Sequence, residues 1–196
     1  MVTQLQRRRL DRDTVLAAAE GLVDQEGPDA LTMTALAGVL GVKASSLYNH
    51  VPSLEALRGE LQHRAMRELG VLLRNEAMGK TGEGGLRALA HVLRDYGRSH
   101  PGRYGLAMTG SLDPDAFRAA STDATAAFAA IIQSYGIEDL SLDFQVSVFS
   151  ALHGVIVLDT AGFFQGGLDG EHIFEIVLDM VVGSLADAAP DQALAG

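Results

Sequence analysis

The chain contains no cysteine, which excludes both disulfide bonds and thiolate metal sites. Its six histidines show no metal-ligand spacing such as His-x-x-x-His, and its carboxylates are scattered over positions that we expect to face solvent. Ser150 and His153 share one helix face, but no third group is placed to orient them, so they make a weak nucleophile pair. We therefore expect no catalytic residues, no metal and no cofactor.

Two further absences bound the fold and the location. No segment alternates apolar and polar residues as a half-buried strand does, and the sequence has no internal repeat. The N-terminus is polar and basic without a signal-peptide pattern, and the most apolar segment, residues 144–158, is too short and too polar to span a bilayer. We therefore expect an all-α protein that stays in the cytoplasm and has no membrane partner.

The net charge of −10 is distributed unevenly along the chain. Residues 1–70 carry eight Lys and Arg against nine Asp and Glu, whereas residues 71–196 carry seven against sixteen. The first twelve residues hold four arginines, among them Arg7, against Asp11 alone. This basic arm suits a phosphate backbone or a minor groove, although a solvated, disordered terminus has the same composition.

One stretch, residues 31–51, predicts two short helices joined by a glycine turn. Thr32 can cap a helix whose apolar residues recur at helical spacing, and Gly41 can end it in the left-handed conformation. A second helix over residues 44–50 turns Leu47 inward and leaves its polar residues outward. This is the layout that places a helix in a DNA major groove.

The flanking segments complete a small helical domain. An upstream helix with an apolar face from Val15 to Val23 stops at Gly27 and Pro28, and Pro52 disfavours helical geometry at the residue before it. Ser53 can cap a long helix that continues to about residue 78 and then meets a flexible break over residues 79–85. We expect a three-helix DNA-binding domain over residues 1–53 and a larger helical domain over residues 54–196.

These residues resemble the tetracycline-repressor (TetR) family of prokaryotic transcription regulators. The resemblance covers roughly residues 10–60 and rests on residues 15–19, Glu26-Gly27, Leu31-Thr32, Gly41-Val42, residues 47–50 and residues 53–57. A second segment, residues 151–158 followed by 161–163, resembles one ligand-domain subfamily in which Trp-His-Gly is common, with Leu152 at the place of the tryptophan. The resemblance implies a DNA-binding regulator with a ligand-sensing C-terminal domain.

Candidate DNA contacts follow from this resemblance and from side-chain chemistry. Tyr48 and His50 look like the family's backbone-contacting pair, since both can donate to a phosphate oxygen, and Lys43 can act as a point charge. The alternative is that Tyr48 only packs against its neighbours and that His50 is a cation at the end of a helix. The expected base readers are Ser45, Ser46, Asn49, Thr34 and Met33.

The last two predicted helices indicate assembly. Further helices are expected over residues 86–99, 103–108, 114–135, 140–165 and 171–188. Residues 142–158 are apolar on nearly every face, and residues 171–188 carry one charged stripe, at Glu171, Glu175, Asp179 and Asp187. Helices this apolar need cover on most sides, which favours a homodimer with a four-helix interface over a monomer with an unusually apolar core.

The larger domain is expected to sense a small molecule. Its aromatic, methionine and histidine residues can line a mainly apolar cavity with a few polar anchors, although helical spacing also explains them as core. The candidates are His91, Tyr96, Tyr104, Met108, Phe117, Phe128, Phe144, Phe149 and His153. The sequence therefore predicts a repressor that a small apolar effector releases from a palindromic operator. A small all-helical enzyme and a dimeric interaction module without DNA binding stay open as alternatives.

Overall fold

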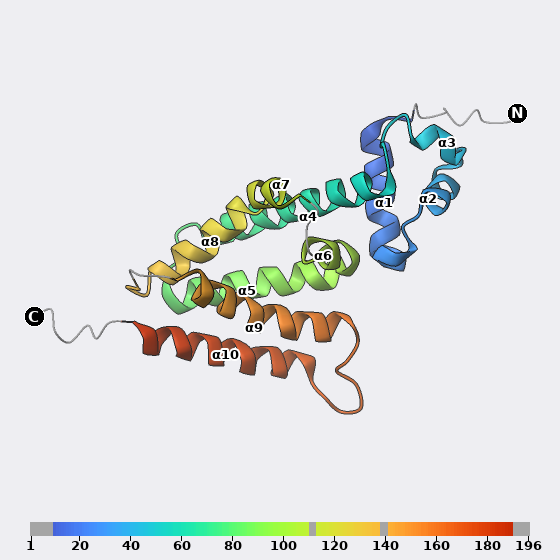
Figure 1. Ribbon diagram of the computed structural model, residues 1–196. Helices are drawn as coiled ribbons and strands as arrows, with labels where there is room; N and C mark the ends of the chain where they lie inside the picture. The colour runs from blue at the N-terminus through green and yellow to red at the C-terminus, as the bar shows by residue number, and fades with distance from the viewer. Residues whose placement is uncertain (1–9, 110–112, 138–140, 190–196) are drawn as a thin grey trace, which may run out of the picture.

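The computed structural model describes residues 10–109, 113–137 and 141–189, and every regular element in these ranges is helical. The expectation of an all-α fold is confirmed. The elements fall into a head, which Figure 1 shows at the N-terminal end of α4, and a body, which includes α4 and packs along it. The head comprises α1 (Arg12–Glu26), the short 3-10 helix η1 (Pro28–Ala30), α2 (Met33–Leu40) and α3 (Ala44–Leu47).

Within the described residues the body comprises seven helices. These are α4 (Leu54–Ala77), α5 (Gly82–Ser99), α6 (Pro101–Ala107), α7 (Pro114–Ala120), α8 (Thr122–Gln133), α9 (Leu142–Thr160) and α10 (Gly170–Ala188). The long helix α4 runs from the head into the body, where α7 and α8 lie along it, while α5, α9 and α10 follow in successive layers away from it (Figure 1). α4 is thus the continuous mechanical link between the two parts.

Helix caps in the head follow the sequence. The side chain of Thr32 accepts a hydrogen bond from the backbone N–H of Ala35 at 3.1 Å, and Ser53 accepts one from Ala56 at 3.0 Å. Gly41 ends α2 with a φ of 65°, in the left-handed region that glycine adopts without steric cost. The predicted glycine turn of the helix-turn-helix is confirmed.

A compact apolar core holds the head together. Leu16, Leu36 and Leu47 are fully buried in it, and Leu57 and Leu61 of α4 and Leu106 of α6 complete it. α3 is shorter than predicted, because residues 48–50 form a turn. Val51, which is buried, and Pro52, which follows it, then prevent the helix from continuing. The head core therefore extends past residue 53 into the body helices.

Two predicted segments of the body differ from the structure. The expected flexible break over residues 79–85 is shorter, because α5 already begins at Gly82, whose backbone N–H donates to the Ser134 hydroxyl. Gly85 lies so close to Ile131 that a Cβ would come within 2.5 Å of it, so this glycine serves close packing instead of flexibility. The helix expected over residues 114–135 is interrupted at Ser121 and forms α7 and α8.

α9 is apolar enough to raise the question of a membrane. By length and composition alone α9 could span one, so the expectation that residues 144–158 are too short and too polar does not hold for the whole helix, of whose most apolar part 22% is buried inside the chain. Several large apolar side chains of α9 and α10 are exposed. They are Leu142, Val146, Val157, Leu158, Ile176 and Met180. The outer face formed by α9 and α10 is therefore apolar.

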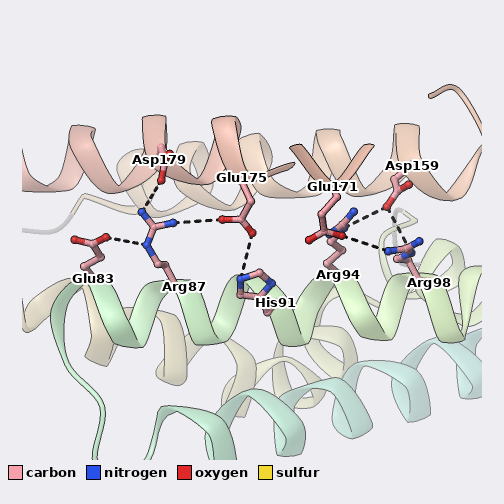
Figure 2. A network of polar contacts seen from close by, with 9 residues as sticks. All are labelled: Glu83, Arg87, His91, Arg94, Arg98, Asp159, Glu171, Glu175 and Asp179. Carbon is pink, nitrogen blue, oxygen red and sulfur yellow. Dashed lines mark hydrogen bonds and ion pairs between the residues drawn. The ribbon is translucent and has the colours of Figure 1, made fainter. Parts of the chain in front are cut away.

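Three residues of the acidic stripe of α10, Glu171, Glu175 and Asp179, face α5 (Figure 2). Glu171 pairs with Arg94 at 2.6 Å, and both Glu175 and Asp179 pair with Arg87. The side chains of Glu171 and Asp179 are 61% and 62% exposed, as expected of carboxylates that face solvent, but they also pair with a row of basic side chains on α5 that the sequence did not indicate. Because the charged side of α10 pairs with α5, an apolar side of α10 is exposed to the outside.

Candidate nucleic-acid interface and aromatic cluster

A set of polar side chains lies on the outside of α2 and α3. We call Thr34, Lys43, Ser45, Tyr48 and Asn49 the polar head surface; all five are exposed, and Tyr48 is 54% exposed. Ser46 and His50 are half-buried beside them. The fully buried Leu47 anchors this segment, so the polar side chains are held outward on a fixed support.

Two other predicted DNA contacts, Met33 and Arg7, are not part of the polar head surface. Met33 is only 9% exposed and packs in the head core, so its side chain does not join the polar head surface. The prediction that Met33 reads bases is wrong in this structure, because the apolar side of α2 turns it inward. Arg7 and the basic arm lie outside the described residues.

The charge around the polar head surface suits a polyanion. Residues 30–54 contain no acidic residue, although the whole chain has a net charge of −10. Lys43 contributes a cation, and hydroxyl, amide and phenol groups contribute hydrogen-bond donors. Such a surface can approach phosphates without like-charge repulsion and can offer donors to backbone or base edges.

Four of the residues predicted to bind ligand come together in the body. The Tyr104 hydroxyl and Nδ1 of His153 lie 2.9 Å apart, and the Phe149 ring stacks on the His153 ring with centroids 5.5 Å apart. Phe128 meets Phe149 edge-on at 6.5 Å. We call Tyr104, Phe128, Phe149 and His153 the aromatic cluster; it draws on α6, α8 and α9.

Burial sets the protonation of the polar pair in this cluster. Desolvation raises the pKa of Tyr104 and lowers the pKa of His153, so both side chains are neutral near pH 7. In one imidazole tautomer the phenol donates to Nδ1 and the ring proton lies on Nε2; in the other, the Nδ1 proton is donated to the phenol oxygen and the phenol proton stays free. The cluster therefore combines aromatic faces with one spare hydrogen-bond donor.

The other predicted ligand residues make different contacts. His91 pairs with Glu175 at 3.4 Å in the contact between α5 and α10, and Tyr96 donates to Glu68 of α4 at 3.1 Å. Met108 and Phe117 pack around a small separate core, and Phe144 packs against the main body core. The structure thus divides one predicted set into a cluster and several packing or ion-pair residues.

A polar junction between head and body is a feature that the sequence did not reveal. Asp24 of α1 accepts from the backbone N–H of Arg103 at 3.0 Å and from its Nε at 2.7 Å. The same arginine reaches Glu68 of α4 at 2.7 Å. The contacting residues are far apart in the chain and come from three helices, so no local spacing could indicate them.

Two hollows lie at this junction. One, of about 420 Å³, lies between α1 and α4 and is lined by paired charges that include Glu20, Arg64 and Arg103. The other, of about 680 Å³, borders η1 and the start of α4 and includes Arg58 and Gln62. Neither hollow is lined by the aromatic cluster.

A three-helix head with an exposed, acid-free helix-turn-helix on a helical body defines a DNA-binding transcription regulator. The model of the tetracyclin repressor-like C-terminal domain matches residues 86–181. The chain is 35% identical to an uncharacterized HTH-type transcriptional regulator of Mycobacterium tuberculosis, Rv0681, over 89% of this chain and 82% of the relative. The chain belongs to the tetracycline-repressor family, whose members are regulators and not enzymes.

Solved structures share the fold. ActR from Streptomyces coelicolor, in complex with (S)-DNPA, has a TM-score of 0.63 and 18% identity, with 92% of this chain and 99% of ActR covered. TetR-Q116A from Acinetobacter baumannii, in complex with minocycline, has a TM-score of 0.64 and 20% identity, with 93% and 100% covered. At these identities the likeness concerns the fold.

Proposed function

We propose that this regulator binds a palindromic operator as a homodimer through the polar head surface of each copy. The observation that carries the proposal is the exposed, acid-free row of donors held by the buried Leu47. Tyr48, His50 and Lys43 contact phosphates in this proposal, while Ser45, Ser46, Asn49 and Thr34 read base edges. Arg7 of the basic arm adds a further backbone or minor-groove contact.

The homodimer is supported by the outer face of α9 and α10. Apolar side chains such as Ile176 and Met180 are exposed there, while Glu171, Glu175 and Asp179 of α10 pair with basic side chains of α5. A second copy laid against this face by a twofold axis buries both apolar surfaces in a four-helix interface. The same axis brings two heads to two half-sites about one DNA turn, roughly 34 Å, or a multiple of it apart.

The effector site proposed here is the aromatic cluster. Its neutral Tyr104–His153 pair and its phenylalanine rings suit a small, mainly apolar molecule that carries one hydrogen-bond acceptor. ActR with (S)-DNPA and TetR-Q116A with minocycline illustrate that proteins of this fold hold small ligands. We place the regulator in the cytoplasm as a repressor, with residues 1–53 as the DNA-binding domain and residues 54–196 as the sensing and dimerising domain.

The test is selection of bound sequences from a random duplex pool, with the full-length parent and with Tyr48→Ala and Asn49→Ala. The parent should enrich a palindrome that both variants lose. Arg118→Ala, at an exposed position of α7, is the control and should enrich the same motif. If the parent enriches nothing at low salt, the DNA-binding proposal fails and an interaction module without DNA binding becomes the better interpretation.

A further inference from the structure

α6 touches both the aromatic cluster and the head within one helical turn. Tyr104 reaches inward to His153, and its chain neighbour Arg103 reaches the opposite way to Asp24 of α1. The side chains of Arg103 and Asp24 are 13% and 18% exposed, so the pair is mostly withdrawn from water. A displacement of Tyr104 therefore acts on a residue that holds the head.

The contact between α6 and α1 is also tight at the backbone. A Cβ on Gly102 would lie 1.9 Å from the carbonyl oxygen of Val23, so the first turn of α6 rests directly on the last turn of α1. At the other end of α6, the buried side chain of Gln62 donates to the carbonyls of Leu106 and Thr109 at 3.0 and 2.7 Å. α6 is thus fixed at both ends and transmits a shift instead of absorbing it.

His100, the residue before α6, also lies 3.3 Å from Asp24 and belongs to the same junction as Arg103. Three other ion pairs between head and body connect α1 to α4 directly. Arg64 of α4 pairs with Glu20 at 2.9 Å and lies 3.7 Å from Asp13, and Arg12 pairs with Glu60 of α4 at 3.5 Å. These pairs join α1 to α4 without a residue of α6. Arg103, in contrast, contacts α1, contacts Glu68 of α4 and adjoins Tyr104.

We propose that the Arg103–Asp24 pair couples the aromatic cluster to the position of the head, an inference that rests on the proposed function. Arg103 is a positioning residue that touches neither effector nor DNA. When the Tyr104–His153 hydrogen bond is broken, α6 shifts, the Arg103–Asp24 contact weakens and the two heads of the dimer lose their operator spacing. When the Arg103–Asp24 pair has already been removed by substitution, a change in the aromatic cluster no longer alters the affinity for DNA.

A double-mutant cycle tests this coupling without requiring the effector. The operator duplex recovered by selection is titrated by fluorescence anisotropy with the parent, His153→Ala, Arg103→Gln and the double variant. We expect His153→Ala to change the Kd by about fivefold in the parent and by less than about 1.5-fold when Arg103 is already replaced. Asp24→Asn should reproduce Arg103→Gln, and it carries the cycle if Arg103→Gln does not fold.

Arg87→Gln is the matched control, because Arg87 lies in the α5–α10 contact and touches neither α6 nor the head. His153→Ala should retain its full effect in the Arg87→Gln background. Additive effects with both arginines would overturn the inference while leaving the DNA-binding function intact, and equal non-additivity with both would overturn it in favour of general destabilisation. A parent that enriches no operator would mean that the proposed function itself fails.

Discussion

The head and the α9–α10 layer of the body expose opposite kinds of side chain. The head encloses an apolar core around Leu36 and Leu47 and displays polar side chains such as Tyr48 and Asn49. α10 turns Glu171 and Glu175 toward the arginines of α5 (Figure 2). It exposes Ile176 and Met180. The difference indicates two kinds of partner, since a polar, acid-free surface suits a polyanion and an apolar surface suits another apolar surface.

The largest effect should come from reversing the outer face of α10. Met180 is 69% exposed in the single chain, and Met180→Asp would place two carboxylates in the apolar interface of a dimer. Because burying unpaired charge is costly, we expect dimerisation to weaken by about 3 kcal/mol, more than a hundredfold. Analytical ultracentrifugation over a concentration series measures this shift.

Met78→Asp is its control, because Met78 is 70% exposed at the end of α4, away from α9 and α10. It should leave the dimer unchanged. Equal weakening by both variants would mean that the outer face of α10 is not the interface.

A smaller effect should follow from removing the arginine of α5 that pairs with the charged side of α10. The side chain of Arg94 is only 4% exposed, lies over the Phe174 ring at 4.6 Å and pairs with Asp159 and Glu171. Arg94→Met should lower the free energy of unfolding by about 2 to 3 kcal/mol, because Asp159 is left half-buried with weaker compensation. Urea unfolding at fixed protein concentration measures it.

Arg98 provides the contrast within the same network. Its side chain is 54% exposed and contacts the same two carboxylates at 3.7 and 3.8 Å. Arg98→Met should cost less than about 1 kcal/mol, because solvent screens exposed pairs. A cost for Arg98→Met as large as that for Arg94→Met would show that burial does not decide the strength of these pairs.

The junction between head and body should respond to added volume. Gly102→Ala forces a methyl group against the Val23 carbonyl and should destabilise the protein by about 1 to 2 kcal/mol while weakening operator binding. Gly105→Ala, in the same helix with nothing within 4 Å of its Cβ position, should be neutral or slightly stabilising. Thermal melting and anisotropy titration together would contradict this account if the two variants behaved alike.

The smallest effect belongs to single charges on the head. Lys43→Ala should weaken operator binding uniformly across sequences and reduce the salt-dependence slope by about 1, because one phosphate contact is lost. Arg118→Ala removes the same charge from α7 and should leave the slope unchanged. The slope is measured from anisotropy titrations at several salt concentrations, and an unchanged slope for Lys43→Ala would remove that residue from the interface.

Local signals explain which parts of the fold could be predicted. Thr32, Gly41 and Ser53 act on residues within four positions, so the helix-turn-helix and the start of α4 could be located from the sequence. The pairing of Glu171 with Arg94 and of Asp24 with Arg103 joins residues 77 and 79 positions apart, which no helical periodicity records. Tyr104 and His153 were among the candidates chosen by residue type, but only the tertiary structure brings these two together and separates them from His91 and Tyr96.

Hydroxyl-radical footprinting of the parent protein on its selected operator tests the central claim most directly. A dimer whose polar head surfaces read a palindrome should protect two symmetry-related patches with centres about one helical turn, roughly 34 Å, or a multiple of it apart. A single protected patch, or uniform protection along the duplex, would contradict the account.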